Sequence, residues 1–157
     1  MGFLSQLLLI SLIGVTLSQS CIPSNWNYAW VKVGKAWFTQ LKVSRTWLQQ
    51  VEMCKKVEPA HMSTIGTLRN KEENSKIQTT FTGPTWIGGF EVGSTGQWFW
   101  WGANINKITT TFWASGEPSD SSGPNEGCMM YGYRPGRSWD DDMCSALYMG
   151  LCEFRCD

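Results

Sequence analysis

Six cysteines constrain this chain more than any other feature of its sequence. They stand at positions 21, 54, 128, 144, 152 and 156, so none of them falls in the first twenty residues. An even number of cysteines in a small secreted domain is typical of a disulfide framework, here of three bridges. Spacing alone leaves fifteen pairings open. His61 is the only histidine and no CxxC pair occurs, so we do not expect a zinc site of cysteine and histidine.

The N-terminal segment indicates an oxidising compartment. Residues 1–20 carry no charged side chain, and an apolar run over 7–17 is interrupted only by small or hydroxyl residues. The run is too short to span a bilayer. Ser18 and Ser20 stand at the spacing of a secretory cleavage site before Cys21. We predict a signal peptide over 1–20, a single domain over 21–157 and a secreted, extracellular protein without membrane insertion. The alternative is a buried N-terminal helix, since the usual basic residues are missing.

The charge balance excludes two classes of partner. Thirteen lysines and arginines against thirteen aspartates and glutamates leave a formal net charge of zero. No overall field therefore attracts nucleic acid or an anionic membrane. The segment after residue 20, about 137 residues, is long enough for one domain. Ten tryptophans are more than usual, and packing of a small core accounts for most of them.

The first half of this segment shows a strand followed by a helix. Residues 37–43 alternate between apolar and polar side chains and follow Gly34, which predicts a strand. Ser44 is expected to cap the helix, and Pro59 to end it. The expected buried stripe of this helix consists of Trp47, Leu48, Val51 and Cys54.

A second, shorter helix and several strands are expected further along. Asn70 and Glu73 form a capping pattern that opens a helix through Ile77. From Trp86 onward, the short apolar runs WIGG, QWFWW, CMMYGY and MGLCEF alternate with stretches rich in glycine, proline, asparagine and serine. This texture predicts strands and long loops. The chain therefore reads as one α+β domain.

A series of short motifs in the second half carries a family resemblance. Their order and spacing are similar to those of the C-type lectin domain over the whole of residues 21–157. The resemblance implies an α+β fold with two helices, small antiparallel sheets whose terminal strands pair, and a long calcium-binding loop region. The motifs are WIGG at 86–89, Trp113 before GEPS at 116–119, Glu126 before Cys128, WDD at 139–141 before Cys144, and GLCE at 150–153.

The resemblance also implies two disulfides, Cys54–Cys152 and Cys128–Cys144. Cys21 departs from the family pattern, because Ala36 occupies the position of its usual partner after Gly34-Lys35. Cys156 is the remaining thiol, and the family's fold brings the first and last strands together, so we expect Cys21–Cys156. The alternative is an intermolecular bridge at Cys21, which would make the protein a homo-oligomer.

The resemblance further assigns a calcium site. Calcium takes six to eight oxygen ligands with loose angular requirements, which carboxylates and hydroxyls on a rigid loop can supply. In the family the bond before Pro118 is cis, which directs the flanking side chains to the same side. Phe90 and Gly127 occupy positions of a second calcium site but lack side-chain oxygens, so we expect one principal calcium ion. The alternative is a solvated acidic loop. The matched ligands are Glu117, Ser119, Glu126, Asp140 and Asp141.

The same residues are expected to bind a sugar. In related lectins, sugar hydroxyls complete the calcium shell, donate to glutamates and accept from asparagine amides. Here Ser119 and Asp140 replace both asparagines, and an aspartate only accepts, so donors to the sugar are fewer. The EPS and WDD motifs resemble invertebrate members that bind galactose-type glycans with an aromatic platform. Alternation places Tyr131 and Tyr133 on one face, and Tyr133 is the expected platform. Trp113 is assigned to the core.

Other functions are weighed against this lectin. The carboxylates of Glu117 and Glu126 resemble a glycosidase pair, but we expect a binding protein and not an enzyme. A serine triad would need His61, which in the family is a packed structural residue, and no Gly-x-Ser-x-Gly elbow is present. The stronger alternative is a domain of the same fold that binds protein, mineral or ice surfaces without sugar recognition.

Overall fold

The structure is a computed structural model that describes residues 21–119, 126–133, 136 and 138–156. The expected signal peptide over residues 1–20 lies outside this range. Within the described part of the chain, no helix has the length and apolar character that crossing a membrane requires.

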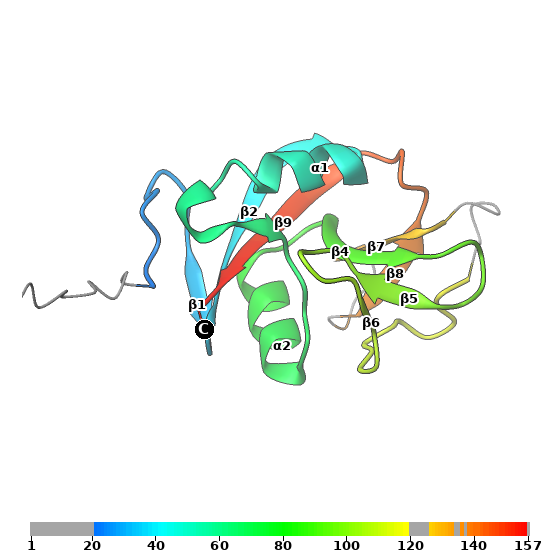
Figure 1. The fold of residues 1–157 in the computed structure, drawn as a ribbon. Helices are drawn as coiled ribbons and strands as arrows, with labels where there is room; N and C mark the ends of the chain where they lie inside the picture. The colour runs from blue at the N-terminus through cyan, green and yellow to red at the C-terminus, as the bar shows by residue number, and fades with distance from the viewer. Residues whose placement is uncertain (1–20, 120–125, 134–135, 137, 157) are drawn as a thin grey trace, which may run out of the picture.

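Two helices pack against a mixed, mostly antiparallel sheet, as the sequence predicts (Figure 1). The strands follow the order β1-β2-β9-β4-β5-β6, while β3 pairs with β9, and β7 pairs with β4 and β8. The elements are β1 (Val31–Val33), β2 (Ala36–Arg45), α1 (Trp47–Cys54), the 3-10 helix η1 (Pro59–His61), β3 (Thr64–Ile65), α2 (Lys71–Thr80), β4 (Thr85–Glu91), β5 (Trp98–Trp100), β6 (Asn106–Lys107), β7 (Cys128–Tyr131), β8 (Trp139–Asp142) and β9 (Tyr148–Arg155).

The terminal strands of the domain lie side by side. β2 runs antiparallel to β9, with Thr39 opposite Cys152, and β9 runs parallel to β4, with Gly150 opposite Trp86. Figure 1 shows α1 above and α2 below the pair formed by β2 and β9. Side chains alternate along each strand, so Trp86 packs in the apolar cluster under α1 and Ile87 in the cluster that contacts α2.

Helix α1 differs from its prediction at both ends. Thr46, not Ser44, is the N-cap: its hydroxyl accepts from the Gln49 backbone, and the Gln49 side-chain oxygen accepts from the Thr46 backbone. Ser44 remains in β2, because that strand continues to Arg45. The helix ends at Cys54, and Pro59 begins η1 instead of ending α1. Its buried face is Trp47, Gln50, Val51 and Cys54.

Leu48 was expected on that buried face, but its side chain is 58% exposed. The position is taken by Gln50, whose amide donates to the carbonyl oxygens of Val43 and Tyr148. Those two carbonyls lie at the irregularity where the pairing of β2 with β9 shifts register. Tertiary hydrogen bonding therefore favours burial of a polar residue here, since it supplies two acceptors for the amide nitrogen of Gln50.

Helix α2 begins where predicted and runs further than expected. The Asn70 side chain accepts from the Glu73 backbone at 2.9 Å, as the capping pattern predicts. The Glu73 carboxylate accepts from the Arg69 backbone and from the guanidinium of Arg155 on β9. The helix continues to Thr80, beyond the expected end at Ile77.

Three disulfides join Cys21 to Cys156, Cys54 to Cys152 and Cys128 to Cys144, with Cα–Cα distances of 5.7, 5.2 and 5.1 Å. The first ties the start of the described chain to the residue that follows β9. The second joins α1 to β9, and the third joins β7 to the segment after β8. These are the pairs expected from the sequence, and all three are intramolecular in this structure.

Candidate functional site

The aspartates of the WDD motif lie on β8, a short strand held on one side by β7. The register places Asp140 opposite Met130 and Asp141 opposite Met129. Asp140 and Asp141 are 8% and 6% exposed. Two neighbouring carboxylates are thus almost withdrawn from water, which is costly unless charge or hydrogen bonding compensates it.

Trp113 and Trp139 bring the GEPS segment next to this strand. The Trp139 backbone donates to Phe112 and accepts from Ala114, at 2.7 and 2.8 Å, which forms a parallel bridge between Trp113 and Trp139. Trp113 is half-buried and packs edge-on against Trp139 and Trp98, which confirms its assignment to the core. A turn in which the Glu117 backbone donates to Ala114 then directs the chain back toward β8.

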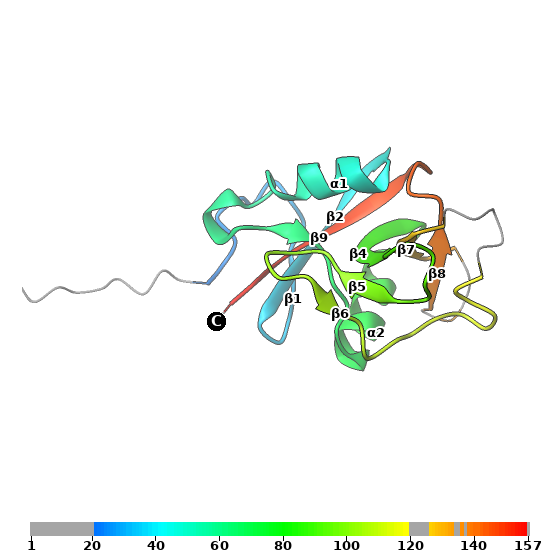
Figure 2. The same ribbon diagram turned by 45° about the vertical axis from the view of Figure 1, so that its right-hand side comes forward.

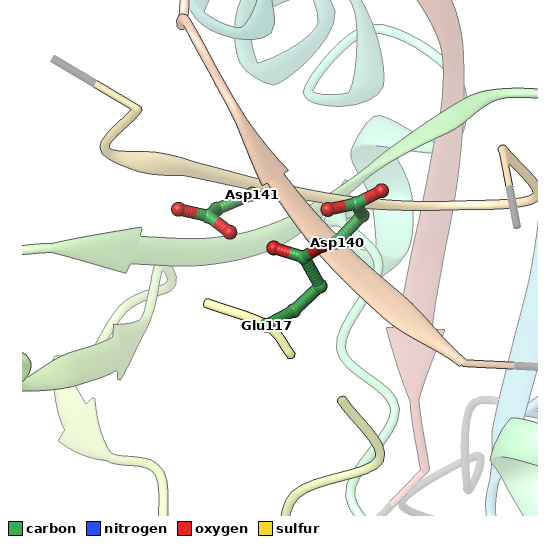
Figure 3. Close-up of side chains that lie close together, drawn as sticks. All are labelled: Glu117, Asp140 and Asp141. Atoms are coloured by element: carbon green, nitrogen blue, oxygen red, sulfur yellow. The ribbon is translucent and has the colours of Figure 1, made fainter. Parts of the chain in front are cut away.

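The carboxylates of Glu117, Asp140 and Asp141 meet at the end of this turn. One ligand oxygen of each residue lies within 4.8 Å of those of the other two. Figure 3 shows the Asp140 and Asp141 side chains on the two sides of the β8 ribbon, with the Glu117 carboxylate between them. Adjacent residues of a strand point to opposite faces, so Asp140 and Asp141 leave the strand in different directions. The Glu117 carboxylate, from the turn after Ala114, lies between them.

Ser119 and Glu126 hold different places around this carboxylate group. The Ser119 backbone donates to Asp141 Oδ1 at 3.0 Å, which orients that carboxylate. The peptide bond between Glu117 and Pro118 is cis. Glu126 is 1% exposed and lies just before β7, but among the described residues it is not part of the group whose oxygens lie within 4.8 Å of one another.

Asp142, the third aspartate, is held elsewhere. Its carboxylate accepts from the Tyr148 hydroxyl at 2.5 Å and from the Met143 backbone at 2.7 Å. Burial and the bond to Asp142 both raise the pKa of Tyr148 above its ordinary value, which strengthens the preference of this phenol for the donor form. This bond withdraws Asp142 from the group formed by Glu117, Asp140 and Asp141.

The two tyrosines after Cys128 do not share a face as alternation predicted. Strand β7 ends at Tyr131, which is 1% exposed, whereas Tyr133 is 68% exposed. Gly132 between them has φ of +86°, and a Cβ at this position would lie 2.3 Å from the Gly83 carbonyl oxygen. This left-handed, close-packed glycine breaks the alternation and turns Tyr133 outward.

The carboxylate group fits a calcium ion by its chemistry. Its donors are hard oxygens, the type of ligand that calcium prefers. Three carboxylates this close repel one another, and a divalent cation would compensate this repulsion. Glu117, Asp140 and Asp141 are therefore the side chains that would hold the ion. At the positions of a second site, Phe90 and Gly127 offer no side-chain oxygen.

One residue that fixes the WDD motif, Asn74 on α2, could not be identified from the sequence. The Trp139 indole is fully buried and donates to Asn74 Oδ1 on α2 at 2.8 Å. Asn74 Oδ1 also accepts from Gln78 at 2.7 Å. Asn74 precedes Trp139 by 65 residues, so no local spacing pattern reveals the contact.

His61 is a packed residue, as the resemblance implies. Its ring stacks on Phe154 with centroids 4.7 Å apart, and its Nδ1 lies 3.4 Å from the carboxylate of Glu58. It belongs to the segment after α1 and has no part in the carboxylate group, which is formed by other residues.

Comparisons with known proteins place this geometry in a family. The type-2 ice-structuring protein of Hemitripterus americanus is 28% identical over 130 residues, covering 83% of this chain and 75% of that protein. Asialoglycoprotein receptor 2 of Homo sapiens is 28% identical over 143 residues, covering 87% of this chain and 42% of the receptor. The chain thus spans less than half of the receptor's length.

Solved structures show the same fold. The C-type lectin CEL-I from Cucumaria echinata superposes with a TM-score of 0.71 at 18% identity, covering 87% of this chain and 99% of that chain. A calcium-independent type II antifreeze protein superposes with a TM-score of 0.70 at 22% identity, covering 85% and 94%. A sequence model of the lectin C-type domain matches residues 43–154. The chain therefore belongs to the C-type lectin domain family, and its fold is the C-type lectin-like fold.

Proposed function

We propose that this protein is a secreted, calcium-dependent lectin that binds galactose-type glycans. The observation that carries the proposal is the group formed by Glu117, Asp140 and Asp141, whose oxygens lie within 4.8 Å of one another. When bound, calcium would supply coordination positions for two neighbouring hydroxyls of a sugar. Secretion is supported by the three disulfides, which persist in oxidising compartments.

Different residues of the chain have different roles in the proposed site. Glu117, Asp140 and Asp141 would hold the ion, and Ser119 positions Asp141 through its backbone. We include the Ser119 hydroxyl and Glu126 in the proposed site because they match family positions. The carboxylates accept hydrogen bonds from sugar hydroxyls but donate none, so stacking on Tyr133, which is 68% exposed, would supply further affinity.

Binding is proposed instead of catalysis because the single histidine of the sequence is a packed structural residue. His61 is stacked on Phe154 beside Glu58, an arrangement that serves packing. A single shallow sugar contact is expected to be weak, so useful retention would need several domains on a dense glycan surface.

Glycan-array binding with and without a calcium chelator tests this proposal. We expect galactose-terminated glycans to be retained with calcium and released by the chelator. Glu117→Gln and Asp141→Asn should abolish retention, whereas Asp142→Asn, outside the carboxylate group, should keep it. Tyr133→Ala should weaken retention without removing calcium binding. Retention that persists in chelator refutes the calcium mechanism, and a clear preference for mannose refutes the assignment to galactose.

Ice binding is the second candidate function, favoured by the similarity to the type-2 ice-structuring protein. The same preparation should be assayed for thermal hysteresis with and without calcium. Thermal hysteresis without any glycan retention would favour ice binding over the lectin proposal. Glycan retention without thermal hysteresis would support the lectin proposal.

A further inference from the structure

A groove beside the C-terminal end of β5, at Trp100, shares no residue with the carboxylate group described above. It consists of two adjoining cavities of about 200 and about 300 Å³, which share Arg69, Trp100 and Asn106. Figure 2 shows the connection between β5 and β6 reaching toward the segment before β3, while β8 lies beyond the opposite end of β5. The groove runs between this connection and the segment that follows α1.

The smaller cavity carries positive charge. Arg69 and Lys107 line it together with Asn106, Thr109 and Thr110, and no acidic residue of the described chain is among its lining residues. The Arg69 side chain is 51% exposed, and Lys107 is exposed. Two cations beside hydroxyl and amide donors form a surface that suits a sulfate or carboxylate group.

The larger cavity differs in its chemistry. Asn104 and Asn106 offer amide donors and acceptors, and half-buried Trp101 forms part of one wall. Glu153 is among its lining residues, with a 2%-exposed side chain that accepts from Arg155 at 2.8 Å and from Thr67 at 2.7 Å. Arg69, which lines both cavities, lies 3.8 Å from Glu153. Most of the negative charge of Glu153 is thus compensated within the protein.

We propose that this groove binds an acidic saccharide, with its sulfate or carboxylate group in the smaller cavity and a neutral sugar ring in the larger one. An anion on a polyhydroxylated body matches the division between cations at one end and amides with an aromatic wall at the other. An acidic peptide matches less well, because Arg155, the further cation of the larger cavity, is already paired with Glu73 and Glu153. The repeated charges of a peptide would therefore gain little there.

The groove site is independent of calcium and of the proposed lectin function. Its lining residues come from the segment between η1 and α2, which includes Arg69, from the end of β5, from β6 and the residues on either side of it, and from β9. None of them belongs to the carboxylate group of Glu117, Asp140 and Asp141. A protein that uses both sites would hold one glycan by calcium and a second, acidic one by ion pairing.

Titration calorimetry in excess chelator tests the groove with three probes: a sulfated galactan oligosaccharide, a carboxylated galacturonan oligosaccharide and an unsulfated galactan of equal length. Either acidic probe should bind, and the binding probe identifies the anionic group. Lys107→Gln and Arg69→Gln should each weaken binding about threefold and together about tenfold, because exposed ion pairs contribute modestly. Lys76→Gln, which removes an exposed cation on α2, should have no effect. Salt should weaken binding.

Arg69 also donates to Thr67 at 2.9 Å, so thermal melting must show that the Arg69 variant remains folded. Lys107→Gln removes a cation of the groove without breaking the bond to Thr67 and so tests the proposal independently. Equal binding of the unsulfated galactan, or equal effects of Lys76→Gln and Lys107→Gln, would overturn the proposal. Competition by polyglutamate of equal charge would also overturn it, in favour of nonspecific charge. Loss of binding in Asp141→Asn would assign the saccharide to the carboxylate group instead.

Discussion

Replacing Asp141 with asparagine should change stability in opposite directions with and without calcium. Asp141 and Asp140 are 6% and 8% exposed, and their oxygens lie with that of Glu117 within 4.8 Å of one another. Asparagine has nearly the same shape and keeps the Oδ1 that accepts from the Ser119 backbone. The substitution therefore removes one charge while leaving the local hydrogen bond in place.

The magnitudes follow from Coulomb repulsion and mass action. At an effective dielectric constant near 20, two carboxylates about 5 Å apart repel by roughly 3 kcal/mol. Because Glu117 is only half-buried, solvent screening lowers the net relief, and we expect Asp141→Asn to gain about 2 kcal/mol in chelator. Calcium at about 100 times its Kd should stabilise the unmodified protein by about 2.7 kcal/mol. For a domain of this size that is a Tm rise of about 8 °C.

Differential scanning calorimetry of the unmodified protein, Asp141→Asn and Asp142→Asn, each in excess calcium and in chelator, checks this expectation. Asp141→Asn should melt about 6 °C above the unmodified protein in chelator and gain little from calcium. Asp142→Asn should keep the calcium-dependent rise, because Asp142 is bonded to Tyr148 instead. The reasoning is refuted if Asp141→Asn melts below the unmodified protein by the same amount in both conditions.

Three further expectations concern stability. Trp139→Phe should lower the free energy of unfolding by about 1–3 kcal/mol, since it loses packing volume and the bond to Asn74; denaturant unfolding measures this, and an unchanged midpoint would contradict it. Hydrogen bonds from Ser24, Asn25 and His61 outweigh burial and lower the pKa of Glu58 below 4.5. Its contribution is therefore fully present above pH 4.5 and is lost as pH falls through the lowered value; Glu58→Gln should remove this part of the acid dependence in denaturant titrations, and identical pH profiles would count against it. Non-reducing peptide mapping should recover the three disulfides, and the paired replacement of Cys128 and Cys144 by serine should cost about 3 kcal/mol; a Cys21-linked dimer would instead favour the intermolecular bridge.

Features that depend on local chemistry could be predicted from the sequence. Asn70 caps α2 because its side chain reaches a backbone only three residues away, and the apolar runs after Trp86 form the expected strands. The six cysteines and the motif order were sufficient to predict the family. Glu117, Asp140 and Asp141 could also be named as candidate ligands, since the residue types and spacing of the GEPS and WDD motifs are visible without a structure.

Features that depend on contacts between distant segments were decided by the tertiary structure. Leu48 has helical spacing for burial, yet Gln50 takes the buried place because the carbonyls of β2 and β9 need its amide. Tyr133 faces outward because Gly132 must pass close to Gly83. Such positions are set by partners many residues away, which a spacing rule cannot include.

The carboxylate group shows the same division. The sequence by itself determined that three aspartates follow Trp139 and that Glu117 stands in a turn near Pro118. Only the tertiary structure decided which of them meet: the Trp113–Trp139 bridge carries Glu117 to β8, and Tyr148 holds Asp142 away. The physical reason is that two carboxylates repel equally at equal distance whether they are neighbours in the chain, like Asp140 and Asp141, or far apart in it, like Glu117 and Asp141. Strand pairing and hydrogen bonding across the fold therefore select the members of the group.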